Sequence, residues 1–142
     1  MSLLAIAMGL PAIADLATGN SDWQVFAGSA AVALFVGVSL MLATRASSRS
    51  NLNLRQAFLL TTMSWVAVAT VGALPFVFSG LNLSIADAFF ESMSGITTTG
   101  STILDDIERS SKGVLIWRAI LQWLGGIGII VMAITLMPIM NV

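Results

Sequence analysis

Three long stretches that are almost free of charge decide what this chain can fold into. They are residues 23–44, 56–78 and 114–137, and Arg118 is the single charged residue within them. An α-helix rises about 1.5 Å per residue, so roughly 20 apolar residues cross a hydrocarbon core of about 30 Å. A chain with 57% hydrophobic residues and a mean hydropathy of +0.95 is also too apolar for a soluble domain. We therefore predict an all-α membrane protein with three full spans.

A fourth apolar stretch, residues 3–16, is too short to span a membrane. It has about 14 residues and includes Gly9 and Pro11. We interpret it as the back half of a helix whose first residues are missing. A cleaved signal peptide is the alternative, but the lysines or arginines that open such a peptide are absent from the start of this sequence.

Missing residue types and the charge balance exclude several classes of function. The chain has no cysteine and no histidine, which excludes a disulfide framework, a Cys/His zinc site and a histidine acid–base catalyst. The formal charge is −1 and the six Lys and Arg residues are widely spread. A nucleic-acid partner is not expected, because binding phosphates requires clustered positive charge.

The distribution of charge between the loops predicts an orientation. The loop from Arg45 to Arg55 carries three arginines and no acid, whereas the turn near Asp15 and Asp22 carries two acids and no base. Positively charged loops stay in the cytoplasm. The first helix therefore runs outward, the three spans follow in alternating directions, and residues 79–113 lie on the outer side.

A helix of half the membrane thickness is expected within that outer segment. Ser84 and Asp87 have the spacing of a capping box, with Asp87 in the positively polarised first turn. A helix that starts there and ends near Gly95 has about 12 residues and a length of about 18 Å. A polar, glycine-bearing segment follows it, and then a full span. This order predicts a re-entrant loop, since irregular backbone at that depth must be buried by protein or lined by water.

The residue types after the half-helix are typical of an ion-selectivity filter. Thr97, Thr98 and Thr99 offer hydroxyl and carbonyl oxygens without charge, so they can replace part of a cation's hydration shell. Gly100 permits the unusual dihedrals that aim successive carbonyls at one axis. The half-helix would direct its partly negative end at the same place. Acids just outside the segment would enrich cations near its mouth; they are Asp105, Asp106 and Glu108.

Two stretches also resemble a known family. DAFFESMSGITTTGST (residues 87–102) and WRAILQWLGGIGIIVMAITLMP (residues 117–138) are similar to the first helix, pore-loop, helix unit of the bacterial Trk/Ktr potassium-uptake family, specifically its Trk-type membrane subunits. The resemblance is strongest over residues 74–138. It implies that Gly100 is the filter glycine, that Thr98 and Thr99 are the main potassium contacts, and that Ser101 follows them in the filter.

The resemblance also implies what surrounds this chain. Members of that family carry four such units around one pore, form homodimers in the bacterial inner membrane and bind a cytosolic nucleotide-binding regulatory subunit. We therefore expect a fragment of a potassium transporter, with residues 1–55 forming an N-terminal helix pair and residues 56–142 the first pore unit. A self-assembling tetramer is the alternative. Whether transport is channel-like or a symport with protons or sodium stays open.

Several residues have a second interpretation. The threonine run could be an external turn with Gly100 as its hinge. Glu91 could be catalytic, but a role behind the filter, bonded to backbone amides or paired with Arg118, is preferred. Arg118 could equally snorkel to headgroups. Trp23 and Trp117 suit interfacial anchoring, and three glycines suggest close helix packing; they are Gly125, Gly126 and Gly128.

Two other classes of function remain as alternatives. An intramembrane hydrolase would need a base for Ser94, and no histidine exists in the chain and no lysine in a predicted span. We therefore do not expect an enzyme. A non-conducting accessory or scaffold subunit is the second alternative, and it predicts that cation flux is unchanged when Thr98, Thr99 and Gly100 are replaced.

Overall fold

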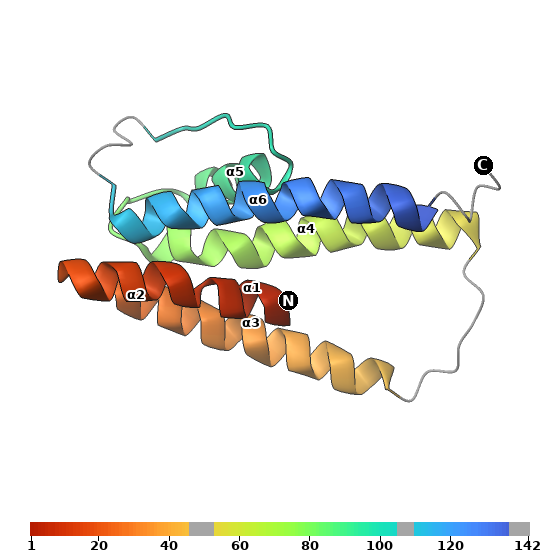
Figure 1. Cartoon of the computed structure of the whole chain (residues 1–142), viewed down its shortest axis with the longest axis horizontal. Helices are drawn as coiled ribbons and strands as arrows, with labels where there is room; N and C mark the ends of the chain where they lie inside the picture. Colours follow the sequence, from red (N-terminus) through yellow and green to blue (C-terminus); the bar gives the residue numbers. More distant parts are fainter. Residues whose placement is uncertain (46–52, 105–109, 137–142) are drawn as a thin grey trace.

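The computed structural model describes residues 1–45, 53–104 and 110–136, and these residues form helices joined by turns and irregular segments (Figure 1). The helices run in the order α1 (Ser2–Ala7), α2 (Gly9–Thr18), α3 (Trp23–Thr44), α4 (Leu54–Phe78), α5 (Ile85–Ile96) and α6 (Lys112–Leu136). Three of them, α3, α4 and α6, are long and apolar enough to cross a membrane. The prediction of an all-α membrane protein is confirmed, and each span begins within two residues of its predicted start.

The short apolar stretch at the front forms two helices instead of one. α1 and α2 follow each other with a turn at Met8 between them. Pro11 explains the break, because proline lacks an N–H and its ring crowds the carbonyl four residues earlier, here that of Ala7.

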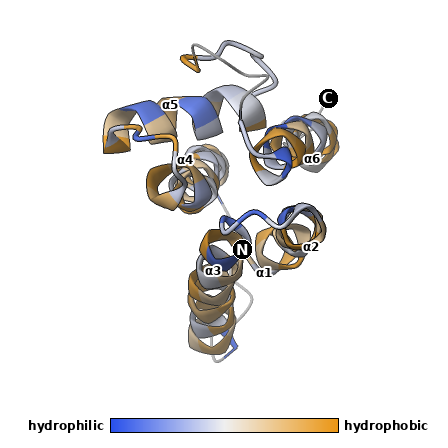
Figure 2. Cartoon of the chain, turned by 90° about the vertical axis from the view of Figure 1, so that its left-hand side faces the viewer, coloured by the Kyte–Doolittle hydropathy of each residue, from blue (hydrophilic) through white to orange (hydrophobic). Residues whose placement is uncertain are grey.

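The helices form two groups (Figure 2). α1 and α2 pack along α3, while α5 packs against both α4 and α6. Contacts between α2 and α6 join the groups. At that junction the rings of Phe26 and Trp117 meet edge to face, with centroids 6.5 Å apart.

The connections between the helices lie at two opposite ends of the bundle. The end of α3 and the start of α4 lie at one end, with Arg45 and Arg55, and the α2–α3 turn and the start of α6 lie at the other (Figure 1). α5 reaches from that second end to about the middle, and residues 97–104 return toward the same end (Figure 1). Arg49 and the acids Asp105, Asp106 and Glu108 lie outside the described residues.

Trp117 does not lie at an interface as the sequence suggested. Its side chain is fully buried, and its indole Nε1–H donates to the Gly72 carbonyl at 2.9 Å. The expectation of interfacial anchoring is therefore wrong for Trp117, because the residue faces the junction of α4 and α6 and not the membrane surface. Trp23 is 37% exposed, as an anchoring role requires.

Asp15 is a buried carboxylate that joins α2 to the start of α6. One oxygen accepts from the Gly113 N–H at 2.7 Å, and the other accepts from the Ser111 hydroxyl at 3.3 Å. Ser111 also caps the helix, since its hydroxyl accepts from the Val114 N–H. An acid near the positive end of α6 satisfies amides that have no partner within the helix.

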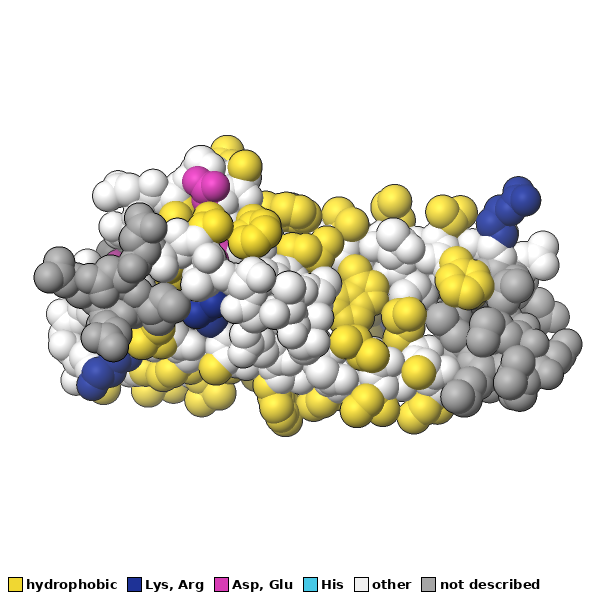
Figure 3. Space-filling view, turned by 90° about the horizontal axis from the view of Figure 1, so that it is seen from above, with side chains coloured by type: hydrophobic (Ala, Val, Ile, Leu, Met, Phe, Trp, Pro, Cys, Tyr) yellow, Lys and Arg dark blue, Asp and Glu magenta, His cyan; other side chains and the backbone are white. Residues whose placement is uncertain are grey.

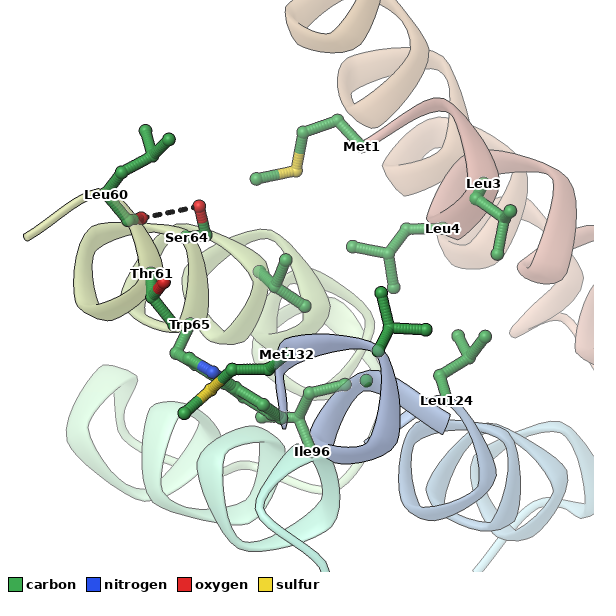
Figure 4. A pocket seen from close by; sticks show the side chains of 13 residues that line it. Met1, Leu3, Leu4, Leu60, Thr61, Ser64, Trp65, Ile96, Leu124 and Met132 are labelled. Carbon is green, nitrogen blue, oxygen red and sulfur yellow. Dashed lines mark hydrogen bonds between the residues drawn. The ribbon is translucent and has the colours of Figure 1, made fainter. Parts of the chain in front are cut away.

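A cavity of about 400 Å³ lies between α1, α4, α6 and the last residue of α5 (Figure 4). Its polar residues, Thr61 and Ser64, donate their hydroxyl hydrogens to carbonyls of their own helix. The cavity therefore has an apolar character. Its lining includes Leu4, Leu60, Trp65, Ile96, Leu124 and Met132.

Candidate functional site

α5 begins at the capping box that the sequence predicts. The Ser84 hydroxyl oxygen accepts from the Asp87 N–H at 3.2 Å, and the Asp87 carboxylate accepts from the Ser84 N–H at 3.3 Å. The helix then runs for 12 residues to Ile96. The predicted half-membrane helix is confirmed in both its start and its length.

The backbone after α5 folds back onto the end of the helix. The N–H groups of Thr97 and Thr98 donate to carbonyls of the last helical turn, at 2.9 and 3.0 Å. The Thr99 N–H donates to the Ser94 carbonyl at 3.0 Å, and the Gly100 N–H lies 3.4 Å from the same oxygen. We define residues 97–101 as the filter segment, and the N–H groups of its first four residues are thus turned toward α5. None of the hydrogen bonds among the described residues ends at the carbonyl oxygens of Thr98, Thr99 or Gly100.

Two residues of the filter segment have left-handed backbone conformations. Gly100 has a φ of 78°, which is the unusual geometry expected from its lack of a Cβ. Thr98 has a φ of 58°, which is an outlier for a β-branched residue and costs about 1–3 kcal/mol. Such a conformation persists only where the surrounding contacts impose it. The residue type does not predict this conformation at Thr98, because threonine normally avoids the left-handed region.

Side chains of α5 hold the far end of the filter segment. The Ser94 hydroxyl donates to the Ser101 carbonyl at 2.6 Å. One turn earlier, the Glu91 carboxylate accepts from the Thr102 hydroxyl at 3.0 Å and from the Ile103 N–H at 3.2 Å. Glu91 and Ser94 are three residues apart and share one helix face. Together they form a clasp that fixes the returning chain against the half-helix.

Glu91 also pairs with Arg118 on α6. The Arg118 Nε lies 2.5 Å from a Glu91 carboxylate oxygen, and the Glu91 side chain is fully buried. The two partners that the sequence offered for Glu91, backbone amides and Arg118, therefore occur together. The alternative in which Arg118 reaches the headgroups is wrong here, because its guanidinium turns inward to this carboxylate.

The filter segment is exposed, but several of its polar groups already have hydrogen-bond partners. Residues 97–101 are all exposed, on the face shown in Figure 3, where polar side chains and backbone lie between hydrophobic ones. The Thr97 hydroxyl lies 2.8 Å from both the Met93 carbonyl and the Thr99 hydroxyl, so these side chains are held locally. The Ser101 carbonyl is turned to Ser94. The structure therefore brings all five predicted filter residues, 97–101, to one exposed segment.

Two of these contacts are not predicted from the sequence. Ser94 is considered there only as a candidate nucleophile, and no role is assigned to Thr102, which bonds to the clasp residue Glu91. The three-residue spacing of Glu91 and Ser94 on a short helix was the signal that could have linked them. A nucleophilic role gains no support, because the Ser94 hydroxyl donates to a carbonyl and is buried.

Comparisons with known proteins agree on one family. Residues 22–141 match the family model TrkH, described as cation transport protein. The chain is 44% identical over 142 residues to the Trk system potassium uptake protein TrkI of Halomonas elongata, and this alignment covers 99% of the present chain and 28% of the relative. It is 40% identical over 136 residues to the Trk system potassium uptake protein TrkH of Escherichia coli K12, at 95% and 28% coverage. The corresponding protein of Vibrio parahaemolyticus is 34% identical, with 29% of its length covered.

Proposed function

The chain belongs to the TrkH family of cation transport proteins, and from this premise we propose that it contributes one filter segment to a potassium-uptake pore. The observation that carries the proposal is the exposed turn at residues 98–100, whose carbonyls accept no hydrogen bond from the described residues. Potassium is named in the relatives with which this chain shares 34–44% identity.

The proposed mechanism replaces water by backbone oxygen. A potassium ion that enters the pore loses part of its hydration shell, and the carbonyls of Thr98, Thr99 and Gly100 take the place of that water. Because these oxygens are uncharged, they bind the ion weakly enough for it to leave. Ser101 follows these residues in the proposed filter, and its carbonyl accepts from the Ser94 hydroxyl. We propose that this bond also holds the segment in position.

The clasp supplies rigidity to this arrangement. Behind the segment, the buried Glu91 carboxylate pairs with Arg118, whose side chain is 17% exposed, and also accepts hydrogen bonds from Thr102 and Ile103. A charge pair that is enclosed in this way fixes the helices α5 and α6 relative to each other. We propose that both residues support the filter and do not contact the ion.

The chain spans about 28% of the length of the curated relatives that it matches. We propose that other pore units, beyond this segment, complete the ring of filter strands. Residues 1–55 would form the N-terminal helix pair and residues 56–142 the pore unit. The same family relation supports a homodimer, a cytosolic nucleotide-binding regulatory subunit and a bacterial inner-membrane location, with the filter segment facing outward.

One experiment tests the filter assignment. Gly100→Ser and Gly19→Ser are introduced separately into the protein extended by its downstream reading frame, in a bacterium that lacks potassium uptake. Both glycines have positive φ, 78° and 72°, so both substitutions strain the backbone similarly. We expect Gly100→Ser to reduce growth at low potassium or to admit sodium, and Gly19→Ser to behave as the wild type. Uptake of both ions unchanged by Gly100→Ser would point to an accessory subunit.

A second comparison tests the need for other pore units. The 142-residue chain and the extended protein are expressed side by side at limiting potassium. Rescue by the extended protein alone supports the proposal. Rescue by the short chain would instead support a self-assembling tetramer.

A further inference from the structure

α5 and α6 touch backbone to backbone at the end of the half-helix. A Cβ atom on Gly125 would lie 1.9 Å from the Ile96 carbonyl oxygen and 2.7 Å from the carbonyl carbon. Carbon atoms that are not bonded rest at about 3.5–4.0 Å. A side chain at position 125 must therefore displace the Ile96 peptide group or push α6 away. The hydrogen that glycine carries in this direction points at the oxygen, which is the arrangement of a weak Cα–H···O contact.

We call this close contact between α5 and α6 the seam. At a second point on the seam, the glycine belongs to α5 and the larger residue to α6. A Cβ on Gly95 would lie 3.0 Å from the Leu121 Cβ. Leu121 and Gly125 are one turn apart on α6 and so share a face. α6 thus presents a large side chain to the glycine of α5 and a glycine to the backbone of α5. The two contacts together fix the position of α5 along α6 as well as the distance between the helices.

Ile96 connects this seam to the proposed filter. It is the last residue of α5, and Thr97 follows it directly. The Thr98 N–H is bonded to the Gly95 carbonyl, so the segment is tied to the same helical turn. On the basis of the proposed function, we infer that Gly125 is a positioning residue, which sets the location of the Thr98–Gly100 carbonyls through the Ile96 peptide group.

The next residue along α6 provides a matched control. A Cβ on Gly126 would have no atom within 4 Å, so Gly126→Ala makes the same chemical change on the same helix without a clash. Gly95→Ala is an intermediate case, because its Cβ would lie 3.0 Å from the nearest atom, Leu121 Cβ, which is a milder overlap than the one at Gly125. The three variants therefore form a series of increasing displacement at the end of α5.

The experiment measures uptake by the extended protein, per amount of protein in the membrane. KM for potassium and the ratio of potassium to sodium uptake are determined with tracer ions. We expect Gly126→Ala to match the wild type, and Gly125→Ala to raise KM or lower the ratio by about tenfold, since sites lose function when ligands move by more than about 0.5 Å. Gly95→Ala should change the same quantities in the same direction by less.

Three outcomes would overturn the inference. The first is a Gly125→Ala protein with wild-type KM and ratio, including one in which only the maximal rate falls. The second is a Gly126→Ala protein that changes as much as Gly125→Ala. If Gly125→Ala does not reach the membrane, Gly95→Ala decides, and unchanged KM and ratio in that variant would be the third. The proposed function is judged separately, by Gly100→Ser against Gly19→Ser.

Discussion

Along its length, the bundle divides into two halves. The α5 half lies beside α5 and the start of α6, the other half lies beyond the end of α5, and different interactions hold the two halves together. In the α5 half, side chains cross between helices by directional bonds, as Asp15 does to Gly113, Glu91 to Arg118 and Trp117 to Gly72. In the other half, where α4 and α6 continue without α5, the hydroxyls of Thr61 and Ser64 donate within their own helix and an apolar cavity lies between the helices.

The difference shows where the fold is specified. Hydrogen bonds and buried charge pairs have preferred distances and angles, so they favour one arrangement of helices. Apolar contacts within a membrane have no strong driving force of their own and tolerate repacking. Substitutions should therefore have large effects near α5 and small effects near the cavity.

The largest effect is expected from Glu91→Ala. It leaves the largely buried side chain of Arg118, which is 17% exposed, without its carboxylate and removes the acceptor of Thr102 and Ile103. Loss of one partner from a buried pair costs about 3–5 kcal/mol. The free energy of unfolding in detergent measures it. Glu91→Gln keeps an acceptor and should lose less, whereas a loss below about 1 kcal/mol for Glu91→Ala would show that the pair adds little.

The second largest effect is expected from Asp15→Ala. It should lower the free energy of unfolding by about 2 kcal/mol, because a buried amide at the start of α6 loses its acceptor. Asp22→Ala is the matched control. Asp22 precedes α3 but makes no side-chain capping bond, so its loss should stay within about 0.5 kcal/mol. Equal losses for the two variants, measured by the same unfolding assay, would contradict the role given to Asp15.

Trp117→Phe should lower the free energy of unfolding by about 1 kcal/mol, since it removes the bond to the Gly72 carbonyl while keeping an aromatic ring near Phe26. Trp123 lies on the same helix and is 68% exposed. The same substitution there should have no measurable effect. If Trp123→Phe proved as destabilising, the buried bond would not be the cause.

The smallest effect, with opposite sign, is expected from Gly128→Ala beside the cavity. The new Cβ would lie 3.5 Å from the Trp65 ring, an ordinary contact, and alanine favours a helix over glycine by up to about 1 kcal/mol. The variant should unfold at an unchanged or slightly higher temperature. Clear destabilisation would mean that this half is as tightly specified as the α5 half.

The sequence predicted those features that depend on neighbouring residues. The spans follow from the length of uncharged stretches, and their starts agree with α3, α4 and α6 within two residues. The start of α5 follows from the local capping pair of Ser84 and Asp87. The positive φ of Gly100 agrees with the expectation that glycine permits an unusual backbone geometry after the half-helix. Whether its carbonyl contacts potassium stays a prediction.

The features that the sequence did not predict depend on contacts between distant segments. The burial of Trp117 depends on how closely α4 approaches α6, and no local pattern sets that distance. The partner of Asp15 lies on a helix that begins almost a hundred residues later. The left-handed Thr98 is likewise imposed from outside, by the bonds that draw residues 98–103 back onto α5.

The bond between Asp15 and Gly113 also has a consequence for synthesis. Its partners are 98 residues apart, so the ribosome must complete α3, α4 and α5 before the bond can form. At about 5–20 residues per second, that stretch takes roughly 5–20 s to make. Throughout this interval the carboxylate near the end of α2 has no α6 amide to bind and must keep its water. The first helices can therefore pack along α3 early, but the link between α2 and α6 is among the last contacts to form.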